Sequence, residues 1–235
     1  MKQSIKDSNW LQEFAKRCDR SLVPAYDDRE GRNRWAAAVV KTFPGNSILN
    51  LGGGGQRHLQ KYLGTEQRVH EVDIVGDCDT TLNLDEVDHL PFMDDSFDTC
   101  CAFEVLEHLE RFHLICDEMY RVCKSTLLIS LPNSAVEIVG IWRNMRIYND
   151  PLENGVYSKF YGLPIRFPKD RHRWWLTFED IVRYFVWFEQ AKSCEVKFFI
   201  PEHGQGWKRK GLRMVISRRL FLTLFCSSVW IRIQK

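Results

Sequence analysis

A run of four glycines begins at Gly52, directly after the apolar segment 47–51, and Asp73 lies 21 positions beyond Gly52. Glycines at the end of a strand allow the backbone to approach a ligand, because no Cβ stands in the way. A carboxylate at the end of the next strand can accept hydrogen bonds from the two hydroxyls of a ribose. The pattern predicts a nucleoside site that contains Gly52, Gly53, Gly54 and Asp73.

Three further candidates for chemistry are Glu104, Glu107 and His108, which are spaced at i, i+3 and i+4 around the start of an expected helix. This spacing places them near one face, at the mouth of the expected sheet. An imidazole or a carboxylate there can remove a proton from an acceptor. The alternative, which the sequence favours, is that Glu107 stabilises the helix N-terminus and His108 packs. We therefore assign no metal ligand and keep His108 as a catalytic candidate.

His172 stands between Arg171 and Arg173, before another expected helix. Positive charge on both sides disfavours the imidazolium form, which suits a neutral base. Two alternatives remain: the arginines cover neighbouring tryptophans in a surface loop, or they bind a phosphate or carboxylate together with Lys169. His172 is our second catalytic candidate.

The elements that must position these residues alternate along the chain, which indicates an α/β fold with a mostly parallel sheet and helices on both faces. Only 11 residues separate Asp73 from Asp85, too few for a helical crossover and its strand, so we expect a turn there. Helices are expected over 9–20, 32–43, 56–63, 107–123 and from Thr177, and strands over 47–51, 68–73, 98–103, 125–131, 195–200 and 229–233.

Two more motifs follow the glycines, LPFMDDSFD at 90–98 and FEVLEHL at 103–109. Over residues 48–133 the sequence resembles the class I, Rossmann-like S-adenosylmethionine-dependent methyltransferases, in particular the type 11 group that includes ubiquinone-biosynthesis enzymes. A nicotinamide-binding domain fits less well, because the last glycine of G-x-G-x-x-G is absent near position 57 and the two motifs have no counterpart there.

The resemblance implies a Rossmann-like sheet with an antiparallel last strand, and S-adenosyl-L-methionine as the cofactor. Asn50 replaces the usual Asp of the first motif, and Gln56 stands where its third glycine is expected, so both departures could weaken cofactor binding. By residue, the resemblance implies Gly52 and Gly54 at the methionine and ribose end, Asp73 at the ribose, Asp85 or Glu86 near the adenine, and the backbone of Phe103 and Glu104 closing the site.

We interpret residues 1–235 as a single methyltransferase domain. It divides into N-terminal helices (1–45), the cofactor-binding core (46–132), a lid over the acceptor site (133–175) and a C-terminal helix with closing strands (176–235). Aromatic and basic residues in the lid favour O-methylation of a small molecule, sugar, glycan or lipid-linked acceptor. The alternatives are a quinone or phenol, a protein or RNA as acceptor, or an inactive module that only binds the cofactor or S-adenosylhomocysteine.

The amino-acid composition limits the classes of binding partner that we expect. Thirty-three Lys and Arg against 31 Asp and Glu give a net charge of +2, so we expect no nucleic-acid partner. Residues 208–235 contain basic side chains and no acidic ones, which indicates a solvated face or else peripheral contact with a membrane. The eight cysteines show no metal-site spacing and the N-terminus has no apolar signal segment, so we expect reduced thiols and a cytoplasmic protein.

Overall fold

The structure is a computed structural model. It describes residues 9–136 apart from 22, 25 and 27, and residues 138–139, 171–201 and 216–235. The elements are α1 (Trp10–Arg17), α2 (Arg29–Val40), β1 (Ser47–Leu51), α3 (His58–Leu63), β2 (Arg68–Asp73), β3 (Thr80–Thr81), β4 (Phe97–Phe103), the 3₁₀ turn η1 (Leu106–His108), α4 (Phe112–Val122), β5 (Cys123–Pro132), α6 (Phe178–Lys192), β6 (Glu195–Phe199), α8 (Arg218–Phe225) and β7 (Ser228–Gln234).

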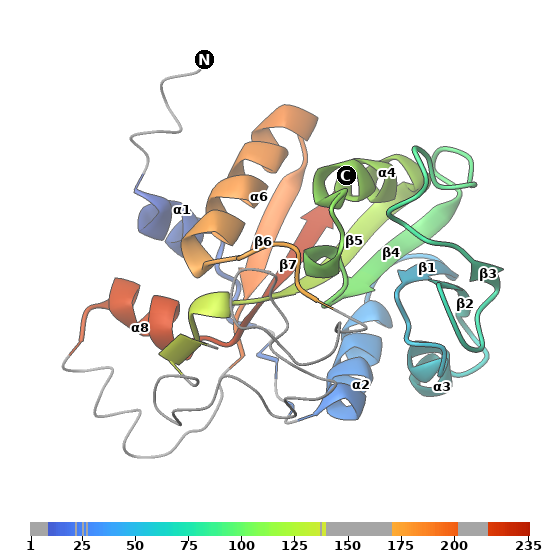
Figure 1. Cartoon of the computed structure of the whole chain (residues 1–235), viewed down its shortest axis with the longest axis horizontal. Coiled ribbons are helices and arrows are strands. Elements are labelled where there is room, and N and C mark those ends of the chain that lie inside the picture. The colour runs from blue at the N-terminus through green and yellow to red at the C-terminus, as the bar shows by residue number, and fades with distance from the viewer. Residues whose placement is uncertain are drawn as a thin grey trace, which may run out of the picture.

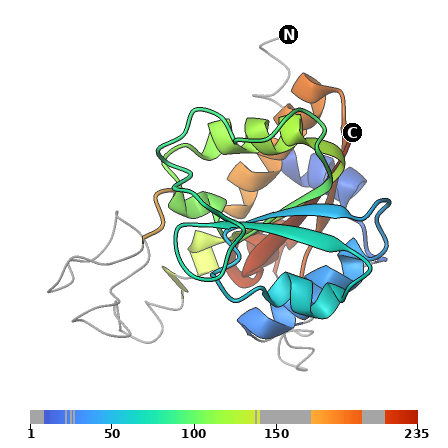
Figure 2. The same ribbon diagram turned by 90° about the vertical axis from the view of Figure 1, so that its right-hand side faces the viewer.

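Seven strands form one sheet in the order β3-β2-β1-β4-β5-β7-β6 (Figure 1). The first five strands in this order, β3, β2, β1, β4 and β5, are parallel to one another. Strand β7 is antiparallel to both of its neighbours, β5 and β6. Helices α1, α4 and α6 cover one face of the sheet, and α2 and α3 cover the other (Figures 1 and 2). The predicted Rossmann-like fold with an antiparallel last strand is confirmed.

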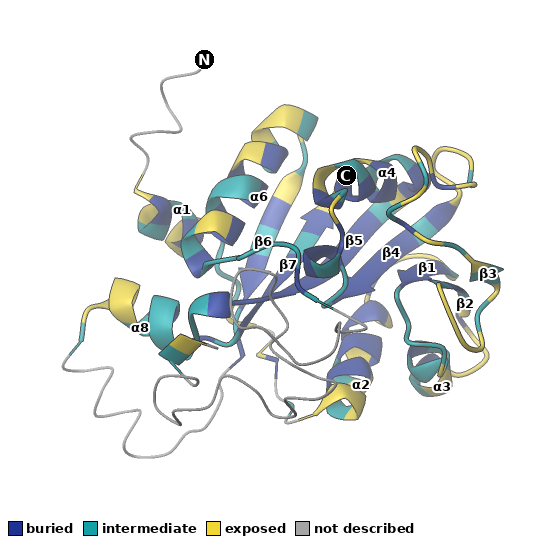
Figure 3. Ribbon diagram, viewed as in Figure 1, coloured by how far each residue is buried: buried dark blue, intermediate teal, exposed yellow. Residues whose placement is uncertain are grey.

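The central strands are buried on both faces, as Figure 3 shows for β1, β4 and β5. In β4, Cys100 packs into the core under α4 and α6, whereas its neighbour Cys101 packs into the core under α2 and α3. A parallel sheet covered on both sides requires such continuous apolar strands. All eight cysteines are free thiols.

Helix α2 begins three residues earlier than the predicted 32–43, because the Asp28 carboxylate accepts a hydrogen bond from Gly31 N at 2.6 Å and caps the helix. The earlier start places Arg29 and Arg32 in the first turn. After β2, the chain reaches the two-residue strand β3 without a helix, so the predicted loss of the crossover helix is confirmed.

The expected helix 107–123 is divided into η1 and α4. A continuous helix would pair Arg111 N with Glu107 O. Here Arg111 N donates to the Asp85 carboxylate at 3.2 Å, and Glu107 O accepts from Arg173 N at 2.7 Å. Partners distant in sequence have therefore replaced the local helical bond.

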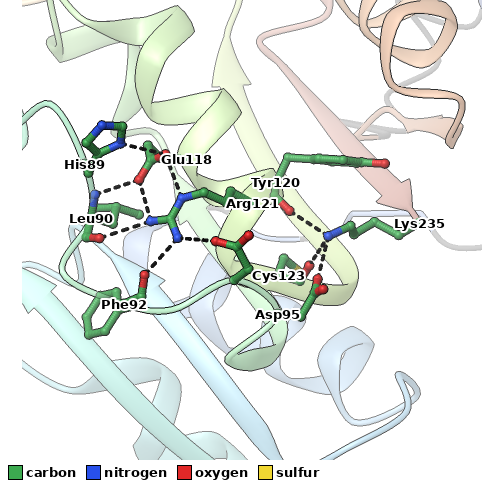
Figure 4. Close-up of polar contacts among 10 residues, drawn as sticks. His89, Leu90, Phe92, Asp95, Glu118, Tyr120, Arg121, Cys123 and Lys235 are labelled. Carbon is green, nitrogen blue, oxygen red and sulfur yellow. Dashed lines mark hydrogen bonds and ion pairs between the residues drawn. The ribbon is translucent and has the colours of Figure 1, made fainter.

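The LPFMDDSFD segment is held by Arg121 of α4 (Figure 4). Its guanidinium donates to the carbonyls of Leu90 and Phe92 and to the carboxylates of Asp94 and Glu118. Beside it, the ammonium of Lys235 donates to the Asp95 carboxylate and to two backbone carbonyls, which fixes the C-terminal end of β7 (Figure 4). Among the described helices, none has the length and apolar character needed to cross a membrane.

Candidate functional site: a cleft at the carboxyl ends of the strands

A cleft of about 970 Å³ lies where β1, β2 and β4 end. Ligand sites of open α/β sheets occupy this edge, and small-molecule pockets span roughly 300–1,000 Å³. The cleft is lined by the glycine loop after β1, by residues at or after the ends of β2, β3, β4 and β5, by the start of α2, by His172 and Arg173, and by Ser227 and Ser228. Its size allows a nucleoside-sized ligand and an acceptor side by side.

The glycine loop forms the floor of this cleft. Gly52 and Gly54 both have positive φ angles, of 69° and 74°. A Cβ at Gly52 would lie 2.4 Å from Cγ2 of Val105, and one at Gly54 would lie 2.1 Å from Nη2 of Arg29. Both positions therefore favour glycine through their backbone conformation, and Gly52 also through lack of space, because the Arg29 guanidinium beside Gly54 can move away.

Asp73 faces the cleft from the end of β2 and also holds the loop. One carboxylate oxygen accepts from Gly54 N at 2.6 Å, and the other accepts from Ile74 N at 2.7 Å. These backbone donors fix the carboxylate in place before any ligand binds. Asp85 lies on the same wall of the cleft, beyond β3.

On the other side of the cleft, Glu107, His108 and His172 come together. One potential ligand atom from each lies within 4.8 Å of the other two. The rings of His108 and His172 are perpendicular, with centroids 4.7 Å apart. His172 is only 7% exposed, which excludes the surface-loop alternative for this side chain. It is placed there by the backbone bonds of Arg173 N and Trp174 N to Glu107 O.

The carboxylate of Glu107 is the unusual member of the cluster. It is 1% exposed, and neither oxygen accepts a hydrogen bond within the described part of the chain. Nε2 of His108 lies 3.8 Å from Oε1 of Glu107. Burial raises the pKa of Glu107 to about 8. A buried carboxyl without donors is stable when it is neutral or when a cation is beside it.

Glu104 is set apart from the cluster. Its φ angle of 55° is unfavourable for a residue with a side chain, and its carboxylate is bonded to Nη1 of Arg32 from α2. Strained backbone of this kind costs about 1 kcal/mol or more and is concentrated at functional sites. The Glu104 backbone lines the cleft at the point where β4 ends.

Residues 49–129 match the family described as a methyltransferase domain. The matched segment contains the strands whose ends form the cleft, and the sheet around it has the class I, Rossmann-like fold of solved methyltransferase structures. The cofactor expected for a domain of this kind is S-adenosyl-L-methionine, which supplies a methyl group for transfer. No curated protein sequence matches the chain significantly.

Solved structures with the same fold include a S-adenosylmethionine-dependent methyltransferase from Archaeoglobus fulgidus. That comparison has a TM-score of 0.53 and 17% identity, and it covers 97% of this chain and 100% of the other. The small RNA methyltransferase HEN1 superposes with a TM-score of 0.56 and 14% identity over 92% of this chain. The present chain spans only 26% of the length of that HEN1 chain. At these identities the likeness concerns the fold.

The cleft fits the cofactor. Gly52 and Gly54 form a cradle that any Cβ would fill, and the fixed carboxylate of Asp73 suits the ribose hydroxyls. The carboxylate of the methionine end suits Arg29, whose guanidinium lies against Gly54 and has no acidic partner among the described residues. When bound, the cofactor supplies an electrophilic methyl group.

Most of the predicted site residues line this cleft: Gly52, Gly54, Asp73, Asp85, Glu104, His108 and His172. Within the described chain, three others do not. Gly53 packs over Glu71, Glu86 accepts a hydrogen bond from Asn83, and the side chain of Phe103 packs against Trp230 on the α2 face. Most of the lid segment, residues 140–170 including Lys169, lies outside the described residues.

Sequence reasoning missed Arg29, Arg32 and Tyr26, which line the cleft from the start of α2 and the chain before it. No motif marks these residues. The sequence feature that could have predicted them is Asp28, a residue type favoured at helix N-caps. Its side chain caps α2, and the first turn of that helix lies beside the glycine loop.

Proposed function

We propose that the methyltransferase transfers the methyl group to a hydroxyl of a small-molecule acceptor, with a sugar, free or as part of a glycan or lipid-linked intermediate, as the first choice. The observation that carries this proposal is the buried Glu107 carboxyl beside the imidazoles of His108 and His172, in the same cleft as the glycine loop. A hydroxyl acceptor loses a proton as the oxygen–methyl bond forms and the sulfur–methyl bond breaks. These three side chains are the groups in the cleft that suit this proton transfer.

An imidazole titrates near neutral pH and can accept the hydroxyl proton. The same oxygen and nitrogen atoms are also a donor set for a divalent cation, and Glu107, His108 and His172 would hold it. Such a cation would supply polarisation of the acceptor hydroxyl. Among the described residues no side chain or backbone group donates a hydrogen bond to the Glu107 carboxylate, which supports this role because a cation would compensate the buried charge.

The test is a turnover assay with radiolabelled cofactor and a panel of sugar nucleotides, simple sugars, phenols and amines, with Mg²⁺ or Mn²⁺ and with EDTA. We expect a sugar to react, and His108→Ala and His172→Ala to lower kcat about 100-fold or more. Their affinity for S-adenosylhomocysteine should stay within about threefold of wild type, as each change removes a group at the acceptor end.

His89→Ala is the matched control, because the His89 side chain is 79% exposed and lies outside the cleft. It should leave turnover unchanged. Reaction of an amine while every hydroxyl acceptor fails would contradict O-methylation. Tight binding of S-adenosylhomocysteine without methylation of any acceptor would identify the inactive binding module instead.

An RNA sugar is a second candidate acceptor. It is motivated by the HEN1 likeness, whose title names small RNA, and by Arg29 and Arg173, which line the cleft and suit a phosphate. Short single-stranded RNA in the same panel tests it. Methylation of RNA with no reaction of the free sugars would favour this candidate over the first.

A further inference from the structure

A buried polar pair lies directly beneath the glycine loop and outside the cleft. Asn50 of β1 and Glu71 of β2 are register partners on adjacent parallel strands. Each is 2% exposed, and Nδ2 of Asn50 donates to Oε2 of Glu71 at 2.7 Å. The pair is therefore a fixed part of the sheet at the point where the loop begins.

The pair is in contact with the loop through Gly53. A Cβ at Gly53 would lie 2.1 Å from Oε2 of Glu71 and 3.1 Å from Nδ2 of Asn50. Gly53 does not have a positive φ angle, so its need for glycine comes from these two side chains rather than from the backbone. The Glu71 carboxyl thus supports the middle of the loop whose flanking glycines line the cofactor cleft.

Two acceptor atoms in this pair have no donor. Oδ1 of Asn50 and Oε1 of Glu71 are both buried, and neither has a hydrogen-bond partner among the described residues. An ionised Glu71 leaves both atoms without a donor, which costs about 1–3 kcal/mol for each unsatisfied group. A proton on Glu71 supplies one hydroxyl donor, and the acceptor without a donor in the same hydrogen-bonded pair is Oδ1 of Asn50.

We propose that Asn50 and protonated Glu71 form a carboxylic acid–amide pair that positions the glycine loop, which makes Glu71 a positioning residue for cofactor binding. In this pair the amide donates to Oε2 and the acid hydroxyl donates to Oδ1, so every polar atom is satisfied. Ionisation of Glu71 removes one of the two bonds beneath Gly53. The loop then binds the cofactor less tightly.

The charged surroundings of Glu71 agree with the neutral form. Burial is the main cause that raises the pKa of Glu71, to about 7, and the nearby carboxylates of Asp79 and Asp73 act in the same direction. Arg57, before α3, opposes them but is itself paired with Asp77 and Asp79. From β4, the group that faces Glu71 is the buried thiol of Cys101, whose pKa is raised well above its usual range and which stays neutral.

The test is calorimetric titration of the full chain with S-adenosylhomocysteine at about pH 6, 7 and 8. In the wild type we expect the Kd to rise up to about tenfold over this range, which corresponds to one unit of pKa difference between free and bound protein. Glu71→Gln replaces the acid by an amide of the same shape that can form both bonds. Its Kd should stay near the wild-type value at the lowest pH and should not change with pH.

Glu66→Gln is the control, because Glu66 is exposed in the turn before β2, and it should follow the wild-type pH dependence. The exchanged variant Asn50→Asp/Glu71→Gln places the acid on β1 and the amide on β2, and we expect it to bind more tightly than Asn50→Asp alone. A parallel pH dependence in Glu71→Gln would overturn the proposal, and so would loss of binding at every pH in a folded Glu71→Gln protein.

If Glu71→Gln does not fold, the wild-type protein decides the question. ¹³C NMR with sequence-specific assignment of the glutamate carboxyl carbons should show the Glu71 resonance titrating near pH 7, the value to which burial raises its pKa, apart from that of Glu107, whose pKa burial raises to about 8. Titration of the Glu71 resonance near the ordinary value of about 4.3 would overturn the proposal.

Discussion

At the scale of single residues, Asp73 both holds the glycine loop and faces the cleft. Its carboxylate accepts hydrogen bonds from Gly54 N and Ile74 N, so it orders the glycine loop while it faces the cleft. The ribose of the cofactor would meet a carboxylate that the backbone already holds, and little conformational entropy remains to be lost on binding. The same side chain therefore shapes the site and, when the cofactor is bound, would also contribute to its recognition.

Asp73→Asn tests this double role. The amide keeps the size of the side chain but offers one acceptor instead of two, so it loses either the loop contact or the ribose contact. We expect the Kd for S-adenosylhomocysteine to rise about tenfold to 100-fold, which is roughly 1.4–2.8 kcal/mol. Calorimetry measures it, with Asp88→Asn as the control because the Asp88 side chain is 85% exposed. An unchanged Kd in Asp73→Asn would exclude the ribose role.

The sequence made Asp73 and the glycines predictable, because the spacing of a strand, a turn and the next strand is a local property. Arg29 and Glu71 were not predictable in the same way. Glu71 has the polar character of a solvent-facing strand residue, and only the register of β1 with β2 places it beneath Gly53. Arg29 reaches the loop because α2 packs on α3 and the sheet, which no local pattern reveals.

At the scale of elements, the LPFMDDSFD segment and α4 form one unit. Glu118 is buried, and it accepts from Leu90 N at 2.7 Å and from the guanidinium of Arg121. The motif that suggested the family in the sequence is thus largely a structural connection. The expected helix 107–123 was only partly right, because helical periodicity could not show that Asp85 and Arg173 replace its local bonds.

Arg121→Met tests this unit. Removing the guanidinium leaves the Glu118 carboxylate buried without its main partner and frees the carbonyls of Leu90 and Phe92. We expect the free energy of unfolding to fall by about 2–4 kcal/mol, as for other broken buried pairs. Urea unfolding measures it. The matched change Arg111→Met removes an ion pair with the exposed Asp88 and should lower the free energy of unfolding by about 1 kcal/mol or less. Equal effects of the two changes would contradict a special role for Arg121.

At the scale of the whole molecule, the cleft is assembled from segments that lie far apart in the chain. The start of α2, the ends of β1, β2 and β4, the residues before α6 and the start of β7 all reach it. A Rossmann-like sheet brings the carboxyl ends of its parallel strands to one edge, so the sequence was sufficient to predict that the glycine loop and Asp73 meet there. It was not sufficient to predict how His172 reaches His108, because that contact depends on backbone bonds to Glu107.

Two buried carboxyls make the stability of the whole molecule depend on pH in opposite directions. Hydrogen bonds from Arg121 lower the pKa of Glu118 from 4.5 to about 2, so its contribution is present above pH 4.5 and is lost as pH falls toward 2. Burial raises the pKa of Glu71 from 4.5 to about 7, so its neutral form favours the folded state at low pH and that advantage is lost as pH rises from 4.5 to 7.

Urea unfolding across this pH range should therefore show two separable effects. Glu71→Gln should remove part of the decline above pH 4.5, about 2–3 kcal/mol by pH 7, and leave the acid side unchanged. Arg121→Met should instead flatten the acid side, because the depressed pKa of Glu118 depends first on that guanidinium. Since each variant is compared with the wild type, the other titrating groups cancel. A Glu71→Gln profile that runs parallel to the wild type above pH 4.5 would show that Glu71 is already ionised in the folded protein at that pH.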